Sequence, residues 1–89
     1  MNKRVLVTAH GKVQNVGFRY FTHKTANALG LSGYVKNQVD GSVYIEAEGP
    51  EELLEEFVYL VKQGPRWANV SRVDVQEAPV DNLKGFVIR

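Results

Sequence analysis

The sequence predicts an α+β fold in which an antiparallel sheet carries two helices on one face. Three observations predict this class. Several short segments alternate apolar, often β-branched residues with polar ones, as strands do when they bury one face. Two longer segments repeat apolar residues every three to four positions, which is the period of an amphipathic helix. Glycine, proline and Asp-Gly signals separate these segments and set their order.

The first strand and the first helix come early in the chain. Residues 5–10 alternate, are rich in β-branched side chains and end at Gly11, which predicts a strand. Residues 18–29 place their apolar side chains along one arc at about 100° per residue, which predicts an amphipathic helix. Gly30 ends this helix, because glycine is favoured directly after a helix.

A hairpin follows the first helix. Residues 31–37 and 42–48 both read as strands, and Asp40 and Gly41 lie in the segment that joins them. Asp-Gly between two strand-like runs is a strong hairpin signal, because this pair accepts the backbone angles of a tight turn. In the second strand, apolar residues alternate with polar or charged ones, so one face is expected to be buried and the other wet.

The last elements are a second helix and two strands. Gly49 and Pro50 open the helix, since proline suits the first turn, and Gly64 ends it. Residues 70–76 and 86–88 are the final strands.

The resulting order is β, α, β, β, α, β with a short extra strand at the C-terminal end. This is the ferredoxin-like βαββαβ sandwich, expected as a single domain over residues 1–89. The fold hosts many unrelated functions, so the chemistry must be argued from particular residues.

Composition narrows the possible functions. Eleven basic and ten acidic residues give a formal net charge of +1, far from the strongly basic balance of a general nucleic-acid binder. The chain has no cysteine, which excludes disulfides, thiolate catalysis and cysteine-ligated metals. No apolar run approaches a membrane span, and the one near the N-terminus is too short for a signal peptide. A cytoplasmic location is therefore expected, with no nucleic-acid or membrane partner.

The most informative segment is the loop over residues 11–19, which reads Gly-Lys-Val-Gln-Asn-Val-Gly-Phe-Arg and connects the first strand to the first helix. A loop entering a helix presents backbone N–H groups without intrahelical partners, and the helix dipole adds partial positive charge there. Arg19 stands in the first helical turn, where its planar guanidinium can bind two phosphate oxygens. The layout predicts a phosphate-binding cradle.

These residues resemble a known family. Residues 11–19 closely match the first signature of acylphosphatases, Gly-x-Val-Gln-Gly-Val-x-Phe-Arg, in the place where that family has it. Residues 33–43, Gly-Tyr-Val-Lys-Asn-Gln-Val-Asp-Gly-Ser-Val, match the second signature, and Gly49 follows at the expected distance. Two ordered signatures on the right elements rarely coincide by chance.

The resemblance implies hydrolysis of the carboxyl-phosphate bond in small acyl phosphates, giving a carboxylate and inorganic phosphate without metal or cofactor. It implies that Arg19 binds the phosphoryl group and that Asn37 orients the attacking water. The backbone N–H groups that would hold the phosphoryl oxygens belong to Gln14, Asn15, Val16, Gly17 and Phe18. This set fits the chemistry, since phosphoryl transfer asks mainly for positioning and charge stabilisation. A monomer is expected.

One residue departs from the family pattern. Asn15 stands where the signature has glycine. If this position needs a positive φ, asparagine is the least costly residue that carries a side chain, because it is enriched in the left-handed region. The cradle is then intact, although the extra side chain could crowd the phosphate or add a contact to it.

Two other functions are open on the sequence alone. One is an RNA-binding module, because such modules share the βαββαβ plan and residues 84–89 echo part of their RNP1 motif. These residues lie at the C-terminal end instead of in the third strand, however, and they lack the paired aromatic residues of that motif. A cradle that binds a small anion without turning it over is also compatible with the residues. His10 and His23 have no second ligand at metal-binding spacing in the sequence, so neither is expected to bind a metal.

Overall fold

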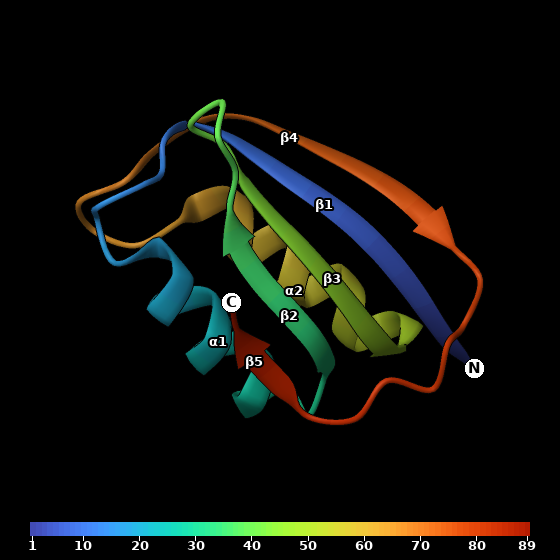
Figure 1. The fold of residues 1–89 in the computed structure, drawn as a ribbon. Helices are drawn as coiled ribbons and strands as arrows, with labels where there is room; N and C mark the ends of the chain where they lie inside the picture. The colour runs from blue at the N-terminus through green and yellow to red at the C-terminus, as the bar shows by residue number, and fades with distance from the viewer.

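The computed structural model describes residues 1–89 and contains five strands in one sheet with two helices (Figure 1). The elements in chain order are β1 (Asn2–Lys12), α1 (Phe18–Ala28), β2 (Ser32–Asn37), β3 (Val43–Pro50), α2 (Glu51–Gln63), β4 (Asn69–Ala78) and β5 (Phe86–Ile88). Across the sheet the strand order is β4-β1-β3-β2-β5. The predicted ferredoxin-like α+β class is confirmed. No helix is long and apolar enough to cross a membrane.

The sheet is mixed rather than antiparallel throughout, which corrects one part of the prediction. Strands β1 to β4 pair antiparallel, but β5 runs parallel to β2, with Gly33 opposite Phe86 and Val35 opposite Ile88. Strand β4 lies at one edge of the sheet and β5 at the other, so the chain between them crosses from edge to edge (Figure 1). Alternation of side chains is the same in parallel and antiparallel strands, and it therefore carries no direction.

Strand β1, which lies between β4 and β3, is longer than its side-chain pattern indicates. It begins at Asn2 rather than residue 5, because Asn2 and Lys3 pair with Pro50 and Gly49 of β3. A strand with neighbours on both sides continues for as long as its backbone finds partners. Its ends are therefore set by pairing, whatever the polarity of the terminal side chains.

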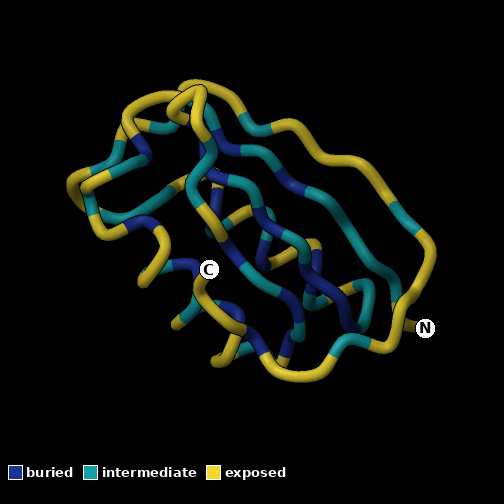
Figure 2. Tube along the Cα trace, in the orientation of Figure 1, coloured by how far each residue is buried: buried dark blue, intermediate teal, exposed yellow.

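One hydrophobic core lies between the helices and the sheet. Helix α1 packs against β2 and β5, while α2 packs against β1 and β3. Figure 2 shows the resulting pattern, in which buried residues alternate along the central strands and line the inward side of each helix. The buried apolar residues are Val7, Ala9, Val13, Phe18, Ala26, Leu31, Val35, Val43, Ile45, Ala47, Leu54, Phe57, Val61 and Phe86.

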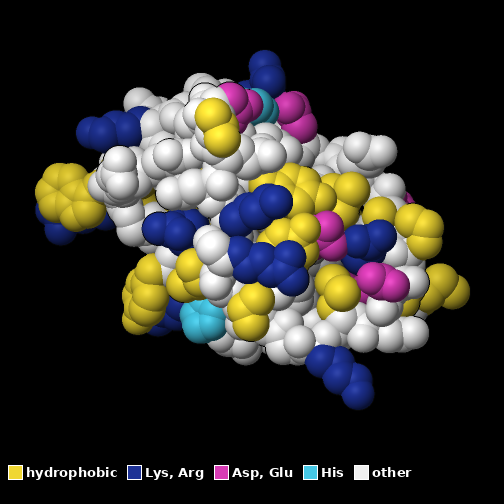
Figure 3. All heavy atoms as spheres, viewed as in Figure 1, with side chains coloured by type: hydrophobic (Ala, Val, Ile, Leu, Met, Phe, Trp, Pro, Cys, Tyr) yellow, Lys and Arg dark blue, Asp and Glu magenta, His cyan; other side chains and the backbone are white.

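The opposite face of the sheet, which the helices leave open, carries a cluster of polar and aromatic side chains. Basic and apolar groups gather at its centre with acidic groups among them (Figure 3). Tyr34 and Tyr44, on neighbouring strands, have ring centroids 6.0 Å apart, and both hydroxyls donate to the Glu46 carboxylate. Arg4 donates to the same carboxylate at 2.6 Å, and the guanidinium of Arg89 lies 3.9 Å from the Tyr34 ring centroid. This tyrosine pair lies outside residues 84–89, and both of its hydroxyls are engaged by Glu46.

The carboxylate at the centre of this cluster changes the titration of its neighbours. Burial, together with the negative charge of Glu46, raises the pKa of Tyr44 to about 12. For Glu46 itself, burial acts upward, but the hydrogen bonds from Tyr34, Arg4 and Tyr44 outweigh it and leave the pKa below its usual value. At neutral pH the Glu46 carboxylate is therefore ionised, and the Tyr44 hydroxyl keeps its proton.

Candidate active site

The loop between β1 and α1 adopts the left-handed backbone conformation at two positions. Asn15 has φ 62°, and Gly17, the residue that precedes α1, has φ 78° and ψ 17°. Left-handed geometry costs most residues roughly 1–2 kcal/mol but is accessible to glycine and asparagine. The position where the family signature has glycine does need a positive φ, so Asn15 keeps the loop geometry.

The backbone N–H groups of this loop have no hydrogen-bond acceptor within the protein. No backbone hydrogen bond outside the regular elements has its donor between Gln14 and Arg19, and the first turn of a helix has no intrahelical acceptors. No side chain caps α1, and its first turn contains no acidic residue, whereas α2 begins with Glu51 and Glu52. Because unpaired N–H groups and the helix dipole attract negative charge, the start of α1 is suited to bind an anion.

A hollow of about 210 Å³ lies against this loop. Eight residues line it: Val13, Asn15, Gly17, Phe18, Arg19, Tyr20, Asn37 and Ile88. Five of the seven residues predicted for the site are among them. The other two, Gln14 and Val16, are not: Val16 packs against the core, and the side chain of Gln14 turns toward the β2–β3 hairpin.

The two side chains with predicted chemical roles each have a free group. Arg19 makes no ion pair with a carboxylate, and its only hydrogen bond runs from Nη1 to the backbone oxygen of Arg89 at 3.2 Å. Asn37 is the last residue of β2, and its Oδ1 is buried without a hydrogen-bond donor. A buried acceptor without a donor costs free energy, so this oxygen is suited to accept a hydrogen bond from a bound water.

Three lining residues were not found from the sequence. Val13 and Tyr20 adjoin the predicted residues along the chain, and the helical position of Tyr20 beside Arg19 is a signal that could have revealed it. Ile88 reaches the hollow only because β5 pairs with β2, where Val35 stands opposite it. No pattern within residues 86–88 indicates that placement.

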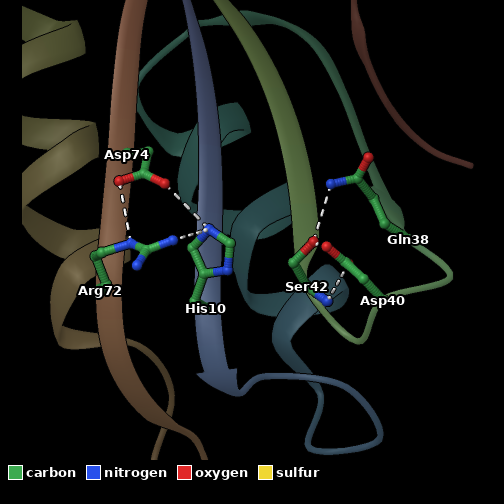
Figure 4. Close-up of polar contacts among 6 residues, drawn as sticks. All are labelled: His10, Gln38, Asp40, Ser42, Arg72 and Asp74. Carbon is green, nitrogen blue, oxygen red and sulfur yellow. Dashed lines mark hydrogen bonds and ion pairs between the residues drawn. The ribbon is translucent and has the colours of Figure 1, made fainter.

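The hairpin that carries Asn37 is tightly bonded within itself. The Gln38 N–H donates to the Ser42 backbone oxygen at 2.9 Å, and the Gln38 side chain donates to Ser42 Oγ at 2.9 Å (Figure 4). Both the N–H and the hydroxyl of Ser42 donate to Asp40 Oδ1. The hydroxyl bond and then the N–H bond lower the pKa of Asp40 below its ordinary value.

His10 lies outside the hollow and has acquired neighbours that the sequence does not place near it. Its Nε2 is 3.1 Å from Asp74 Oδ2 and 3.2 Å from Arg72 Nη2 (Figure 4). Since both contacts use the same nitrogen, the ring either donates to Asp74 or accepts from Arg72. No group of three or more possible metal ligands occurs here or elsewhere in the structure.

Fold and site together define a small ferredoxin-like protein with a loop that is suited to bind an anion. Comparison with known proteins makes this specific, because the sequence model of the acylphosphatase family matches residues 5–88. The acylphosphatase of Thermus thermophilus is 51% identical over 83 residues, covering 93% of this chain and 94% of that protein, and the one from Archaeoglobus fulgidus is 50% identical over 78 residues, covering 88% of each. The crystal structure of the Bacillus subtilis acylphosphatase superposes with a TM-score of 0.96 at 40% identity, over 100% of this chain and 99% of that one. The chain belongs to the acylphosphatase family.

Proposed function

We propose that this protein is an acylphosphatase that hydrolyses small acyl phosphates to a carboxylate and inorganic phosphate. One observation carries the proposal: a single hollow is lined by the uncapped start of α1, by an arginine without a carboxylate partner and by Asn37, which has a buried, unpartnered amide oxygen. Each of these groups suits one part of an in-line attack on a phosphoryl group.

In the proposed reaction, the loop N–H groups from Gln14 to Phe18 and the guanidinium of Arg19 hold the phosphoryl oxygens. Asn37 Oδ1 accepts a hydrogen bond from the attacking water. The water oxygen bonds to phosphorus while the bond to the acyl oxygen breaks, and the carboxylate leaves without needing an acid. An amide cannot serve as a base at neutral pH, so we propose that the phosphate itself takes the water's proton. A pH profile that reveals an enzyme base near neutrality would contradict this step.

We also propose the domain organisation, oligomeric state and location in which this activity occurs. Residues 1–89 act as one acylphosphatase domain, as a cytoplasmic monomer, without a metal, a cofactor, nucleic acid or a membrane. The near-neutral charge and the engaged tyrosine pair on the open sheet face support the absence of a nucleic-acid partner.

The test measures hydrolysis of benzoyl phosphate and acetyl phosphate in the presence of EDTA. Removing a preorganised donor from a site of this kind costs about 10²- to 10³-fold in rate, and we expect Arg19→Ala and Asn37→Ala each to lose at least that much. Arg72→Ala and Asn27→Ala are matched controls, because both residues are exposed and neither lines the hollow. Turnover that survives in the Arg19 and Asn37 variants would remove these residues from the mechanism. Phosphate binding without turnover by the wild type would favour an anion-binding module instead.

A further inference from the structure

The loop that joins β1 to α1, residues 13–17, is called the phosphate-binding loop below. The side chain of Gln14 makes the hydrogen bonds that connect this loop to the β2–β3 hairpin, which carries Asn37. Its Nε2 donates to the backbone oxygen of Gln38 at 2.8 Å and to that of Ser42 at 2.9 Å. The amide group has two hydrogens, and both are used. Otherwise, residues 13–17 make a single hydrogen bond, in which Phe21 N–H donates to Gly17 O.

The two backbone oxygens that accept from Gln14 are fixed by other hydrogen bonds within the hairpin. The Gln38 oxygen also accepts the N–H of Gly41 at 3.1 Å, and the Ser42 oxygen also accepts the N–H of Gln38 at 2.9 Å. Both acceptors thus belong to the bonded hairpin end shown in Figure 4. Gln38 directly follows Asn37, so a group held against the Gln38 oxygen is also held at a set distance from the Asn37 backbone.

The loop end is less constrained. Val13 and Phe18 anchor its two ends in the core, but the N–H groups between them have no protein acceptor. A phosphoryl group bound to those N–H groups can therefore shift relative to Asn37 unless something couples the loop to the hairpin. A displacement of about 1 Å in a reacting group can cost about 10²-fold in rate.

We infer that Gln14 is a positioning residue: its side chain braces the phosphate-binding loop against the β2–β3 hairpin and so sets the alignment between the phosphoryl group and the water on Asn37. This inference rests on the proposed function, and it assigns the Gln14 side chain a task separate from that of the Gln14 backbone N–H. The brace acts through Asn37 and touches neither substrate nor water.

The first test uses Gln14→Met, which keeps the length of the side chain but removes both donors. We expect kcat to fall about 30- to 100-fold, while KM and the inhibition constant of inorganic phosphate change less than about threefold, because the loop N–H groups remain in place. Gln76→Met, an exposed substitution of the same kind on β4, is the control and should keep wild-type kcat. A rise in the phosphate inhibition constant that matches the loss in kcat would overturn the inference, since it would make Gln14 a phosphate ligand or a support of the loop alone.

The second test is a double-mutant cycle with Asn37→Ala. If Gln14 acts through Asn37, Gln14→Met should cost less than about threefold in kcat when Asn37 is already alanine. Losses that multiply would show that the two residues act independently, and the inference would fail.

A readout that does not depend on turnover separates this inference from the proposed function. In the ¹⁵N-labelled wild type, titration with inorganic phosphate should shift the amide signals of residues 14–18 and also those of Gln38 and Ser42. In Gln14→Met only the loop signals should shift. If the wild type binds phosphate but hydrolyses nothing, the proposed activity fails while this comparison still decides the brace. Hairpin shifts that persist in Gln14→Met would refute it.

Discussion

Replacing Asn15 tests whether the loop works through its backbone. Asn15 is exposed, makes no hydrogen bond and has φ 62°. In Asn15→Gly, glycine adopts this conformation without a steric penalty, and no hydrogen bond is lost. We therefore expect kcat/KM on acetyl phosphate to stay at the wild-type value or rise up to about threefold, as removal of the side chain opens the hollow.

The partner variant Asn15→Ala removes the same side chain but keeps a Cβ. Alanine in the left-handed region costs roughly 1–2 kcal/mol, whereas asparagine is enriched there and costs less. An extra 1 kcal/mol against the competent loop corresponds to about a fivefold drop in its population and in kcat/KM. Steady-state kinetics on both variants, with phosphate inhibition measured in parallel, give the comparison. A loss above about tenfold in Asn15→Gly would show that the side chain contacts the substrate, and wild-type activity in Asn15→Ala would show that the left-handed conformation is not required.

Further predictions concern stability and its pH dependence, all measured by urea unfolding. Glu46→Gln should lower the free energy of unfolding by about 2 kcal/mol at pH 7, because the largely buried carboxylate accepts three hydrogen bonds. The folded pKa of Glu46 lies below its usual value of 4.5, so this contribution is present above pH 4.5 and disappears as the pH falls through the folded pKa. The two proteins should therefore converge as the pH is lowered, and a gap that keeps its full size down to the acid-unfolding limit would contradict the assignment. Thr22→Val should raise the free energy of unfolding by about 1 kcal/mol, because the fully buried Thr22 hydroxyl has no hydrogen-bond partner; a loss of stability would reveal a hidden one.

The sequence determined the local features of this protein. The order of elements, the hairpin and both helices follow from periodicity and turn residues, which act over a few neighbours along the chain. The conformation of the loop at residues 11–19 is also a local feature. Asn15 and Gly17 favour the left-handed backbone conformation whatever segments surround the loop. These features account for the fold class and for the choice of Arg19 as a candidate site residue.

Tertiary structure decided everything that depends on which segments meet. The parallel pairing of β5 with β2 brings Ile88 to the hollow, and the hairpin places two backbone oxygens where Gln14 can donate to both. It also leaves Asn37 Oδ1 buried without a partner. Hydrogen bonds and packing across the sheet join residues more than twenty positions apart, and a side-chain pattern records only which face of its own segment is apolar. For that reason the sequence could name Gln14 but not the task of its side chain.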